Sequence, residues 1–378
     1  MTDRSTADRA DESAWSVAET PTDAALYAVV PTVAGPHAVG EDGIVLARAD
    51  DRDGTDHGND DSAKWQVVVS DGPGAHHNAL NDAGVTADGE RVWFAGSSGA
   101  LGAYDVETDT KYDYSAPMEK TSTWEAIAVT GDRGDERVRV ANGSGEVVRG
   151  RIDDRGCPEW DAAREPGSGS SIAALAADGE RFYVADTDGG TFEETGRDRS
   201  AASGQSVNAP ETPDPDQIAS DPETADPDRM TGGLAADIDI SARNAAVDFF
   251  DVTATDETVR VAGDDGLVYR YDRACENWTP TRVGESALHA LAEEGGEAGT
   301  DGESGADGEA GTDGESGADG EAGTDGELLV AGEEGRIYRR TPTTGWREVP
   351  TPAEKDLWGV AVGDPAVAVG EDGVVVER

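Results

Sequence analysis

The stretch WGVAVGDPAVAVGEDGVVVER, residues 358–378, decides the fold, because it consists of three short apolar runs separated by turn residues. Its middle phrase, AVGEDG at 368–373, occurs word for word at 38–43. Degraded copies follow along the chain: FAGSSG (94–99), VANGSG (140–145), VADTDG (184–189), VAGDDG (261–266) and VAGEEG (330–335). The sequence therefore contains seven copies of one structural repeat.

Each repeat has the pattern of a four-stranded antiparallel sheet. Valine-rich runs punctuated by Gly, Asp and Asn indicate strands joined by hairpins, and Gly supplies the positive φ that the tight turns require. A fourth run often opens with Trp, as in WQVVVS (65–70), WDAARE (160–165), WTPTRV (278–283) and WREVP (346–350). Seven such units predict an all-β fold, a seven-bladed β-propeller with four-stranded blades.

Segments without strand character account for the uneven spacing of the repeats. We interpret residues 1–13 as a disordered tail and residues 14–378 as one propeller domain, with disordered insertions at about 50–63, 196–233 and 294–326. The last repeat ends after its third run, whereas WSVAET (15–20) stands at the start without a preceding partner. We expect residues 15–20 to pair with the C-terminal blade and close the ring.

The composition is extremely acidic, with a formal net charge of −50 and only four lysines. It resembles that of cytoplasmic proteins from halophiles that accumulate salt, since molar salt screens such self-repulsion. The scarcity of basic residues argues against nucleic acid as a partner, and no apolar run reaches the length of a membrane span. We expect a cytoplasmic monomer that binds another protein and has no cofactor or metal.

The three insertions are all expected on one face of the ring, which leaves the other face uncluttered. Turn acids and two loop histidines gather on this second face: Glu41, Asp42, His76, His77, Asp264, Asp265, Glu333, Glu334, Glu371 and Asp372. The acids are candidates to bind a basic partner segment or a cation. Acids are abundant everywhere in this chain, so an unspecific solvated surface is the alternative.

Alignment of the innermost runs places five large or polar residues in one column. They are Tyr27, Glu125, Phe250, His289 and Trp358. Alternate residues of a strand face opposite sides, so this column is predicted to line the central channel. It forms either a pocket with aromatic walls or simple packing that plugs the channel.

The pattern of an apolar inner strand, then AVGEDG or VAGDDG, then an apolar strand and a Trp-led outer strand resembles the BNR-type β-propellers related to photosystem II stability and assembly factors. That resemblance implies a seven-bladed ring that binds other proteins and assists assembly without catalysis. The chain lacks a clear Arg cluster, so no contact residue carries over.

Three functions remain open from the sequence. The first is a non-enzymatic interaction or assembly scaffold that binds through the acidic face. The second is a propeller hydrolase or lyase, in which Glu125 acts as acid or base while His289 and Trp358 shape the site. The third is a structural protein with no specific ligand.

Overall fold

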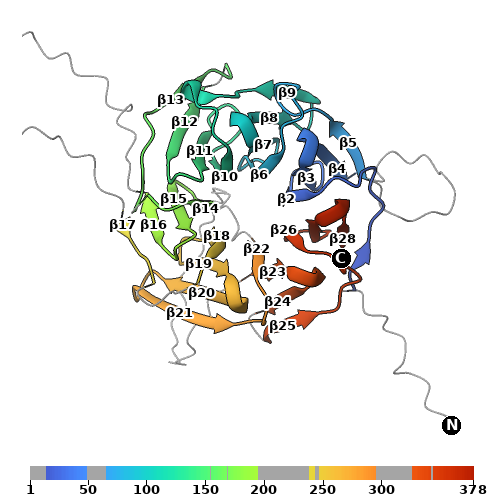
Figure 1. Cartoon of the computed structure of the whole chain (residues 1–378), viewed down its shortest axis with the longest axis vertical. Helices are drawn as coiled ribbons and strands as arrows, with labels where there is room; N and C mark the ends of the chain where they lie inside the picture. The colour runs from blue at the N-terminus through green and yellow to red at the C-terminus, as the bar shows by residue number, and fades with distance from the viewer. Residues whose placement is uncertain are drawn as a thin grey trace, which may run out of the picture.

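The computed structural model describes residues 14–48, 65–194, 238–294 and 326–378, apart from residues 154, 168, 243–246 and 342–343. The predicted tail at 1–13 lies outside these residues, as do the predicted insertions except for their end residues 294 and 326. Within the described part, the strands form seven separate four-stranded antiparallel sheets. The sheets surround a central axis like the blades of a propeller, which confirms the predicted fold (Figure 1).

The first four blades follow one another along the chain. Blade 1 contains β2 (Leu26–Val30), β3 (His37–Gly40), β4 (Val45–Arg48) and β5 (Trp65–Val69). Blade 2 contains β6 (Leu80–Val85), β7 (Arg91–Gly96), β8 (Leu101–Asp105) and β9 (Thr110–Asp113). Blade 3 contains β10 (Trp124–Thr130), β11 (Arg137–Asn142), β12 (Val147–Ile152) and β13 (Pro158–Trp160). Blade 4 contains β14 (Ile172–Asp178), β15 (Arg181–Asp186), β16 (Thr191–Glu194) and β17 (Ile238–Asp239).

The remaining blades complete the ring. Blade 5 contains β18 (Phe249–Ala254), β19 (Thr258–Gly263), β20 (Leu267–Asp272) and β21 (Asn277–Arg282). Blade 6 contains β22 (Leu288–Glu293), β23 (Leu328–Gly332), β24 (Ile337–Thr341) and β25 (Gly345–Val349). Blade 7 contains β26 (Leu357–Ala361), β27 (Val367–Gly370), β28 (Val375–Glu377) and, as its outer strand, β1 (Ser16–Val17).

The two ends of the described chain close the ring as predicted. In β1 and β28, Ser16 pairs with Glu377 and Val17 pairs with Val376 in antiparallel register. The carboxylate of Glu377 accepts hydrogen bonds from Arg48 Nε at 3.1 Å and from Trp65 Nε1 at 2.7 Å, which ties blade 7 to blade 1. Closure removes the exposed sheet edges that an open ring would present.

The fourth run of blade 3 differs from the prediction. WDAARE (160–165) was expected as a strand, but β13 ends at Trp160, and only the isolated bridge from Val147 to Arg164 continues the pairing. Val147 N–H donates to Arg164 O and Arg164 N–H donates to Val147 O, so the chain touches the sheet edge once more after leaving it. Trp160 is therefore the last residue of the outer strand of this blade and not its first.

The first glycine of the repeated phrase allows a close approach between two backbone segments. A Cβ on Gly40, Gly96, Gly263, Gly332 or Gly370 would lie 1.9 to 2.2 Å from the carbonyl oxygen just before the first strand of its blade. The same carbonyl accepts the N–H of the residue after the glycine, as Asp356 O does from Glu371 at 3.0 Å. In these five blades the contact leaves no room for a side chain.

The turn that follows needs two residues in the left-handed region. In blade 7 these are Asp372, with φ 56°, and Gly373, with φ 70°. The sequence predicted positive φ at the glycine alone, but acidic or serine residues share it in five blades. In blades 3 and 4, Asn142 and Asp186 instead accept backbone N–H groups within the turn through Oδ1.

We expect Gly370→Ala to lower the free energy of unfolding by about 1–3 kcal/mol, because the new methyl group forces the turn away from Asp356 O. Chemical denaturation measures the change. Gly143→Ala is the matched control, since its Cβ would meet only the Glu125 side chain, at ordinary contact distances of 3.5 and 3.9 Å. Equal stability of Gly370→Ala and wild type would contradict the close-approach explanation.

Arginine–carboxylate pairs join most neighbouring blades. Six of the seven interfaces between described blades carry one: Arg91–Glu136, Arg139–Glu194, Arg273–Asp178, Arg260–Glu293, Arg378–Glu327 and Arg48–Glu377. Apolar clusters shared by adjacent blades lie beside them, such as Trp93 of blade 2 with Trp124 of blade 3. Much of the limited basic content of this chain is thus used to fasten the ring.

The Arg91 guanidinium illustrates the strength of these links. Its Nε lies 2.5 Å from Asp105 Oδ1 and its Nη1 lies 2.5 Å from Glu136 Oε1, with Glu136 fully buried. We expect Arg91→Leu to lower the free energy of unfolding by about 3–5 kcal/mol, because it removes the counter-ion of the buried Glu136. It also leaves Asp105 only the longer ion pair with Arg133, at 3.8 Å.

Thermal and chemical denaturation test this expectation against Arg181→Leu, which removes only a half-exposed pair with Asp178. The control should change stability by less than about 1 kcal/mol. Similar effects of the two substitutions would show that burial does not set the strength of the interblade pairs.

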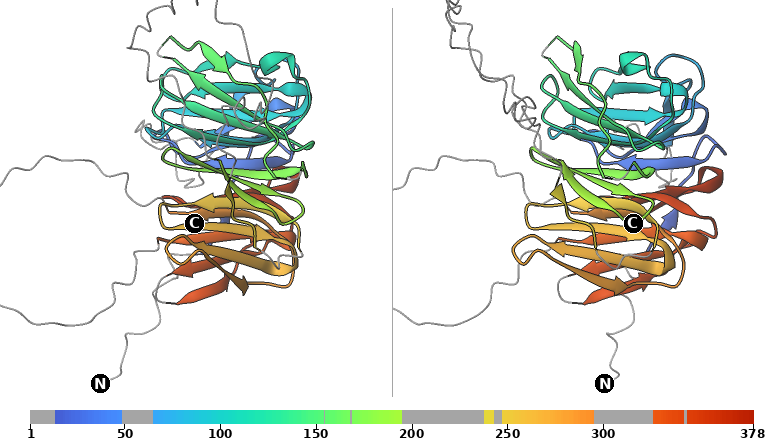
Figure 2. Two further views of the ribbon diagram at one scale, coloured as in Figure 1. Left: turned by 90° about the vertical axis from the view of Figure 1, so that its left-hand side faces the viewer. Right: turned by 60° about the vertical axis from the view of Figure 1, so that its left-hand side comes forward.

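The turns collect on the two faces of the ring, because the strands run across its thickness (Figure 2). One face, here called the turn face, carries the turns between second and third strands and the connections from each fourth strand to the next blade. The opposite face carries the turns between first and second and between third and fourth strands. The predicted insertions join β4 to β5, β16 to β17 and β22 to β23, so they all attach at the opposite face.

Candidate functional site

A bulge in the first strand of every blade directs one side chain toward the axis. In each blade the pairing between first and second strands skips one residue, as between Leu26 and Ala28 in blade 1. The same shift occurs in the other six blades. The skipped residue is free of the ladder, and bulges are a common way to re-aim a side chain.

The seven skipped residues line one cavity of about 240 Å³ in the channel. They are Tyr27, Asn81, Glu125, Ala173, Phe250, His289 and Trp358. The bulge is at the second position of each first strand, the end that meets the turn between the second and third strands. The cavity therefore lies toward the turn face, and all seven blades contribute to it.

One side of the cavity is aromatic. The rings of Tyr27 and Trp358 stack with centroids 5.2 Å apart and an interplanar angle of 27°. Phe250 and His289 meet edge to face at 5.7 Å. Tyr27 Oη donates to Glu41 Oε1 at 3.3 Å, and burial together with the Glu41 charge raises the pKa of Tyr27. The stacked pair presents ring faces beside a carboxylate at the channel mouth.

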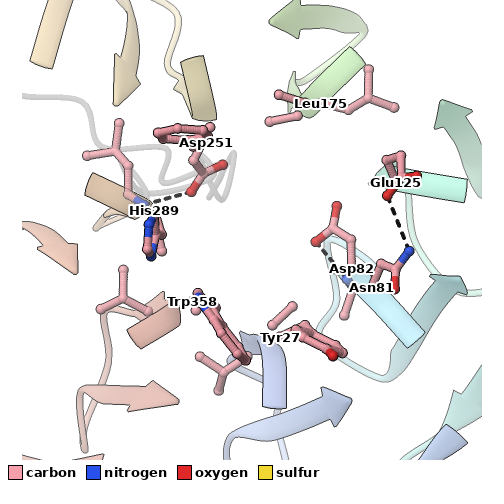
Figure 3. A pocket seen from close by; sticks show the side chains of 18 residues that line it. Tyr27, Asn81, Asp82, Glu125, Leu175, Asp251, His289 and Trp358 are labelled. Atoms are coloured by element: carbon pink, nitrogen blue, oxygen red, sulfur yellow. Dashed lines mark hydrogen bonds between the residues drawn. The ribbon is translucent and has the colours of Figure 1, made fainter. Parts of the chain in front are cut away.

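The other side is polar and acidic (Figure 3). Asn81 Nδ2 donates to Trp124 O at 3.1 Å and lies 3.4 Å from Glu125 Oε2, so it holds the exposed Glu125 carboxylate against the wall. Asp82 lies on this side and Asp251 lies across the cavity beside His289 (Figure 3); each is one residue after the bulge of its strand. Three carboxylates from blades 2, 3 and 5 thus surround the same space.

Asp82 and Asp251 play equivalent structural parts in their blades. Asp82 Oδ2 accepts the N–H of Ile127 in blade 3 at 2.8 Å, and Asp251 Oδ2 accepts that of Leu291 in blade 6 at 2.6 Å. The other oxygen of each accepts the next N–H of its own strand. Each aspartate therefore bridges the innermost strands of two adjacent blades.

The two aspartates have strongly perturbed acidity. Burial raises the pKa of Asp82 to about 7, partly offset by the N–H of Ile127, and the charge of Asp251 raises it further. Burial likewise raises the pKa of Asp251 to about 7 against the N–H groups of Leu291 and Val252. Both side chains line the channel space and are half-buried, and desolvation is the largest cause of the two shifts. Titratable carboxylates near neutrality in a cavity are typical of functional sites.

His289 carries an unused polar atom. Within the described residues and their hydrogen bonds, its Nδ1 is buried without a partner. Such a group is usually paired in a folded protein, but this nitrogen is buried and does not open onto the cavity.

The structure brings together all five residues that the sequence placed in the channel. Asn81 and Ala173 occupy the same column but were not predicted. Asp82 and Asp251 were not predicted either; the residue at the same position is Ala or Gly in the other five blades. The innermost strand of every blade begins with an apolar residue, such as Leu80 or Phe249. Listing the two residues that follow it in each blade would have found all four.

The predicted binding-face residues all lie on the turn face. The acids lie in the turns between the second and third strands of four blades: Glu41, Asp42, Asp264, Asp265, Glu333, Glu334, Glu371 and Asp372. His76 and His77 lie exposed in the connection from β5 to β6. Some of these acids are paired: Lys355 Nζ lies 2.7 Å from Asp372 and Arg336 Nη2 lies 3.0 Å from Glu334. The surface is acidic but partly neutralised.

The residues of the enzymatic alternative are spread over blades 3, 6 and 7. Among the interactions of the described residues, none joins Glu125, His289 and Trp358 to one another. In the same part of the chain, no three His, Cys, Asp or Glu side chains gather to hold a metal ion. None of its helices has the length and apolar character needed to cross a membrane.

Solved β-propellers match nearly the whole ring. The WD40 propeller domain of Doa1 has a TM-score of 0.61 and 11% identity, with 97% of each chain covered. The WD40 repeats of RRP9 give 0.61 and 11%, covering 97% of this chain and 98% of that one. YCF48 bound to a D1 peptide gives 0.58 and 12%, covering 97% and 96%. The likeness is one of fold. No protein-family model matches the sequence, and no curated protein matches it.

Proposed function

We propose that the chain is a non-enzymatic interaction or assembly scaffold that binds a partner protein through the turn face, in a halophile cytoplasm. The observation that carries the proposal is the cavity at the centre of that face, to which all seven blades contribute. A closed ring whose blades are joined by ion pairs is rigid, so the turn face needs no rearrangement to bind a partner. This lowers the entropic cost of binding.

The comparisons support a binding role by analogy. One propeller of similar fold is described as part of the mitotic checkpoint complex, and YCF48 is described with a bound peptide. The latter agrees with the resemblance to assembly-factor propellers in the repeated phrase. These proteins are only 11–12% identical to this chain, so they support binding of another protein by a propeller but do not identify the partner.

Capture from a lysate of the source cells, kept in molar potassium chloride, tests the proposal. The turn-face variant changes six acids to amides: Asp264, Asp265, Glu333, Glu334, Glu371 and Asp372. The matched control changes six exposed acids of the opposite face: Glu107, Asp132, Asp135, Glu180, Asp256 and Glu257. We expect a stoichiometric partner that binds wild type and control but not the turn-face variant. A partner lost equally with both variants, or with neither, would contradict docking on this face.

A channel hydrolase or lyase is the second candidate, favoured by the pKa values of Asp82 and Asp251 near neutrality. Turnover of a small substrate that is lost on Glu125→Gln would support it and would displace the scaffold proposal.

A further inference from the structure

We infer that the channel cavity receives the side chain of an arginine from the partner protein. The inference rests on the proposed function and names what its central site recognises. Three features of the cavity lead to this class of ligand: its size, its walls and its unused hydrogen-bond acceptors.

The size of the cavity fits one side chain. Its volume of about 240 Å³ is below the roughly 300–1,000 Å³ typical of pockets that enclose a whole small molecule. A side chain presented by a docked protein needs only this much space, because the remaining contacts form on the surrounding turn face.

The walls favour a cation with a flat apolar surface. Asp82, Glu125 and Asp251 line the space and would repel an anion. The aromatic rings of Tyr27 and Trp358 also line the space, and aromatic rings attract a cation through their quadrupoles. Because no described trio of acids or histidines is arranged to hold a metal, an organic cation is the better match.

The acceptors favour guanidinium over ammonium. Each oxygen of Asp82 and Asp251 accepts one backbone N–H and keeps further acceptor capacity. The exposed Glu125 carboxylate adds acceptors on another side of the space. A guanidinium offers five N–H donors in one plane and stacks on aromatic rings, whereas an ammonium offers three donors and is more strongly hydrated.

Three short peptides that differ in one residue test the inference. Acetyl-Gly-Ser-X-Ser-Gly-amide is prepared with X as arginine, lysine or citrulline, and binding to the full chain is measured by calorimetry or ligand-observed NMR in molar potassium chloride. Citrulline has the shape of arginine without its charge. We expect the arginine peptide to bind at least about ten-fold more tightly than the citrulline peptide, and more tightly than the lysine peptide.

Variants locate the binding in the channel. Glu125→Gln, an exposed substitution that leaves packing intact, and Trp358→Leu should each weaken arginine-peptide binding about five- to ten-fold. Glu107→Gln on the opposite face should leave it unchanged, and the melting temperature of each variant checks folding.

Equal binding of the arginine and citrulline peptides, equal binding of the arginine and lysine peptides, or wild-type affinity in Glu125→Gln would overturn the inference. If no peptide binds while partner capture still depends on the turn face, this inference fails and the proposed function stands.

Discussion

Raising potassium chloride from a low concentration to the molar range should raise the melting temperature by at least about 10 °C. The chain carries a formal net charge of −50, and turns of the turn face place two acids side by side, as in blades 5 and 6. In molar salt the Debye length falls to about 3 Å, so most of this repulsion is screened. A change of roughly 2–4 °C in melting temperature accompanies each kcal/mol in the free energy of unfolding, so the expected rise corresponds to several kcal/mol of added stability.

A thermal scan at several salt concentrations makes this measurement. The interblade pairs provide an internal contrast, because the buried Arg91–Glu136 contact is screened much less than surface acids are. The destabilisation caused by Arg91→Leu should therefore persist in molar salt. A melting temperature independent of salt would contradict the halophilic interpretation of the composition.

Binding of the arginine peptide should become at least about ten-fold tighter between about pH 6 and pH 8. Burial holds the pKa of Asp82 and Asp251 at about 7, so both are largely protonated below that pH and ionised above it. A cation binds the ionised form, and linkage then requires affinity to rise as pH increases through the pKa. The other ionisable groups that line the same cavity are Tyr27, Glu125 and His289.

The same two groups affect stability in the opposite direction. Their pKa in the folded ring is above that of an ordinary aspartate, so the folded state binds more protons between about pH 4 and pH 7. Their contribution to the free energy of unfolding therefore falls as pH rises through that range.

The double variant Asp82→Asn/Asp251→Asn should flatten the pH dependence of peptide binding. The variant Glu107→Gln should leave the profile as in wild type. An affinity that is constant between about pH 6 and pH 8 would rule out a role for the two aspartates in holding the cation.

The fold could be predicted from the sequence because its repeat is enforced by a backbone contact. In five blades the second strand ends at a glycine, such as Gly370, that passes close to a carbonyl oxygen, and this leaves a recurring phrase. Blades 3 and 4 replace that glycine by Asn142 and Asp186, whose side chains cap the turn, so their phrases are degraded but detectable.

Outer strands were harder to predict, because little constrains them. The outer strand of blade 4 is only Ile238–Asp239, with no Trp, and that of blade 3 ends at the Trp where a strand was expected to begin. Both lie at the rim, where side chains pack on one neighbour only.

The candidate site was predicted in part for a related reason. Bulky channel residues such as Tyr27 and Trp358 stand out in an alignment of inner strands, whereas Asp82 and Asp251 resemble turn acids in so acidic a chain. Their roles depend on backbone N–H groups about 40 residues away, Ile127 and Leu291. The interblade arginine pairs join residues 33 to 329 positions apart, which no local pattern reveals.

The most direct test of the account is site-specific photo-cross-linking of the partner. A photoreactive phenylalanine analogue is placed at exposed position 76 on the turn face or at exposed position 107 on the opposite face, and each protein is irradiated in source-cell lysate at molar potassium chloride. We expect one partner to be cross-linked from His76 and not from Glu107, with the link suppressed by excess arginine peptide. Cross-linking from Glu107 alone would show that the partner binds the other face and would contradict the account.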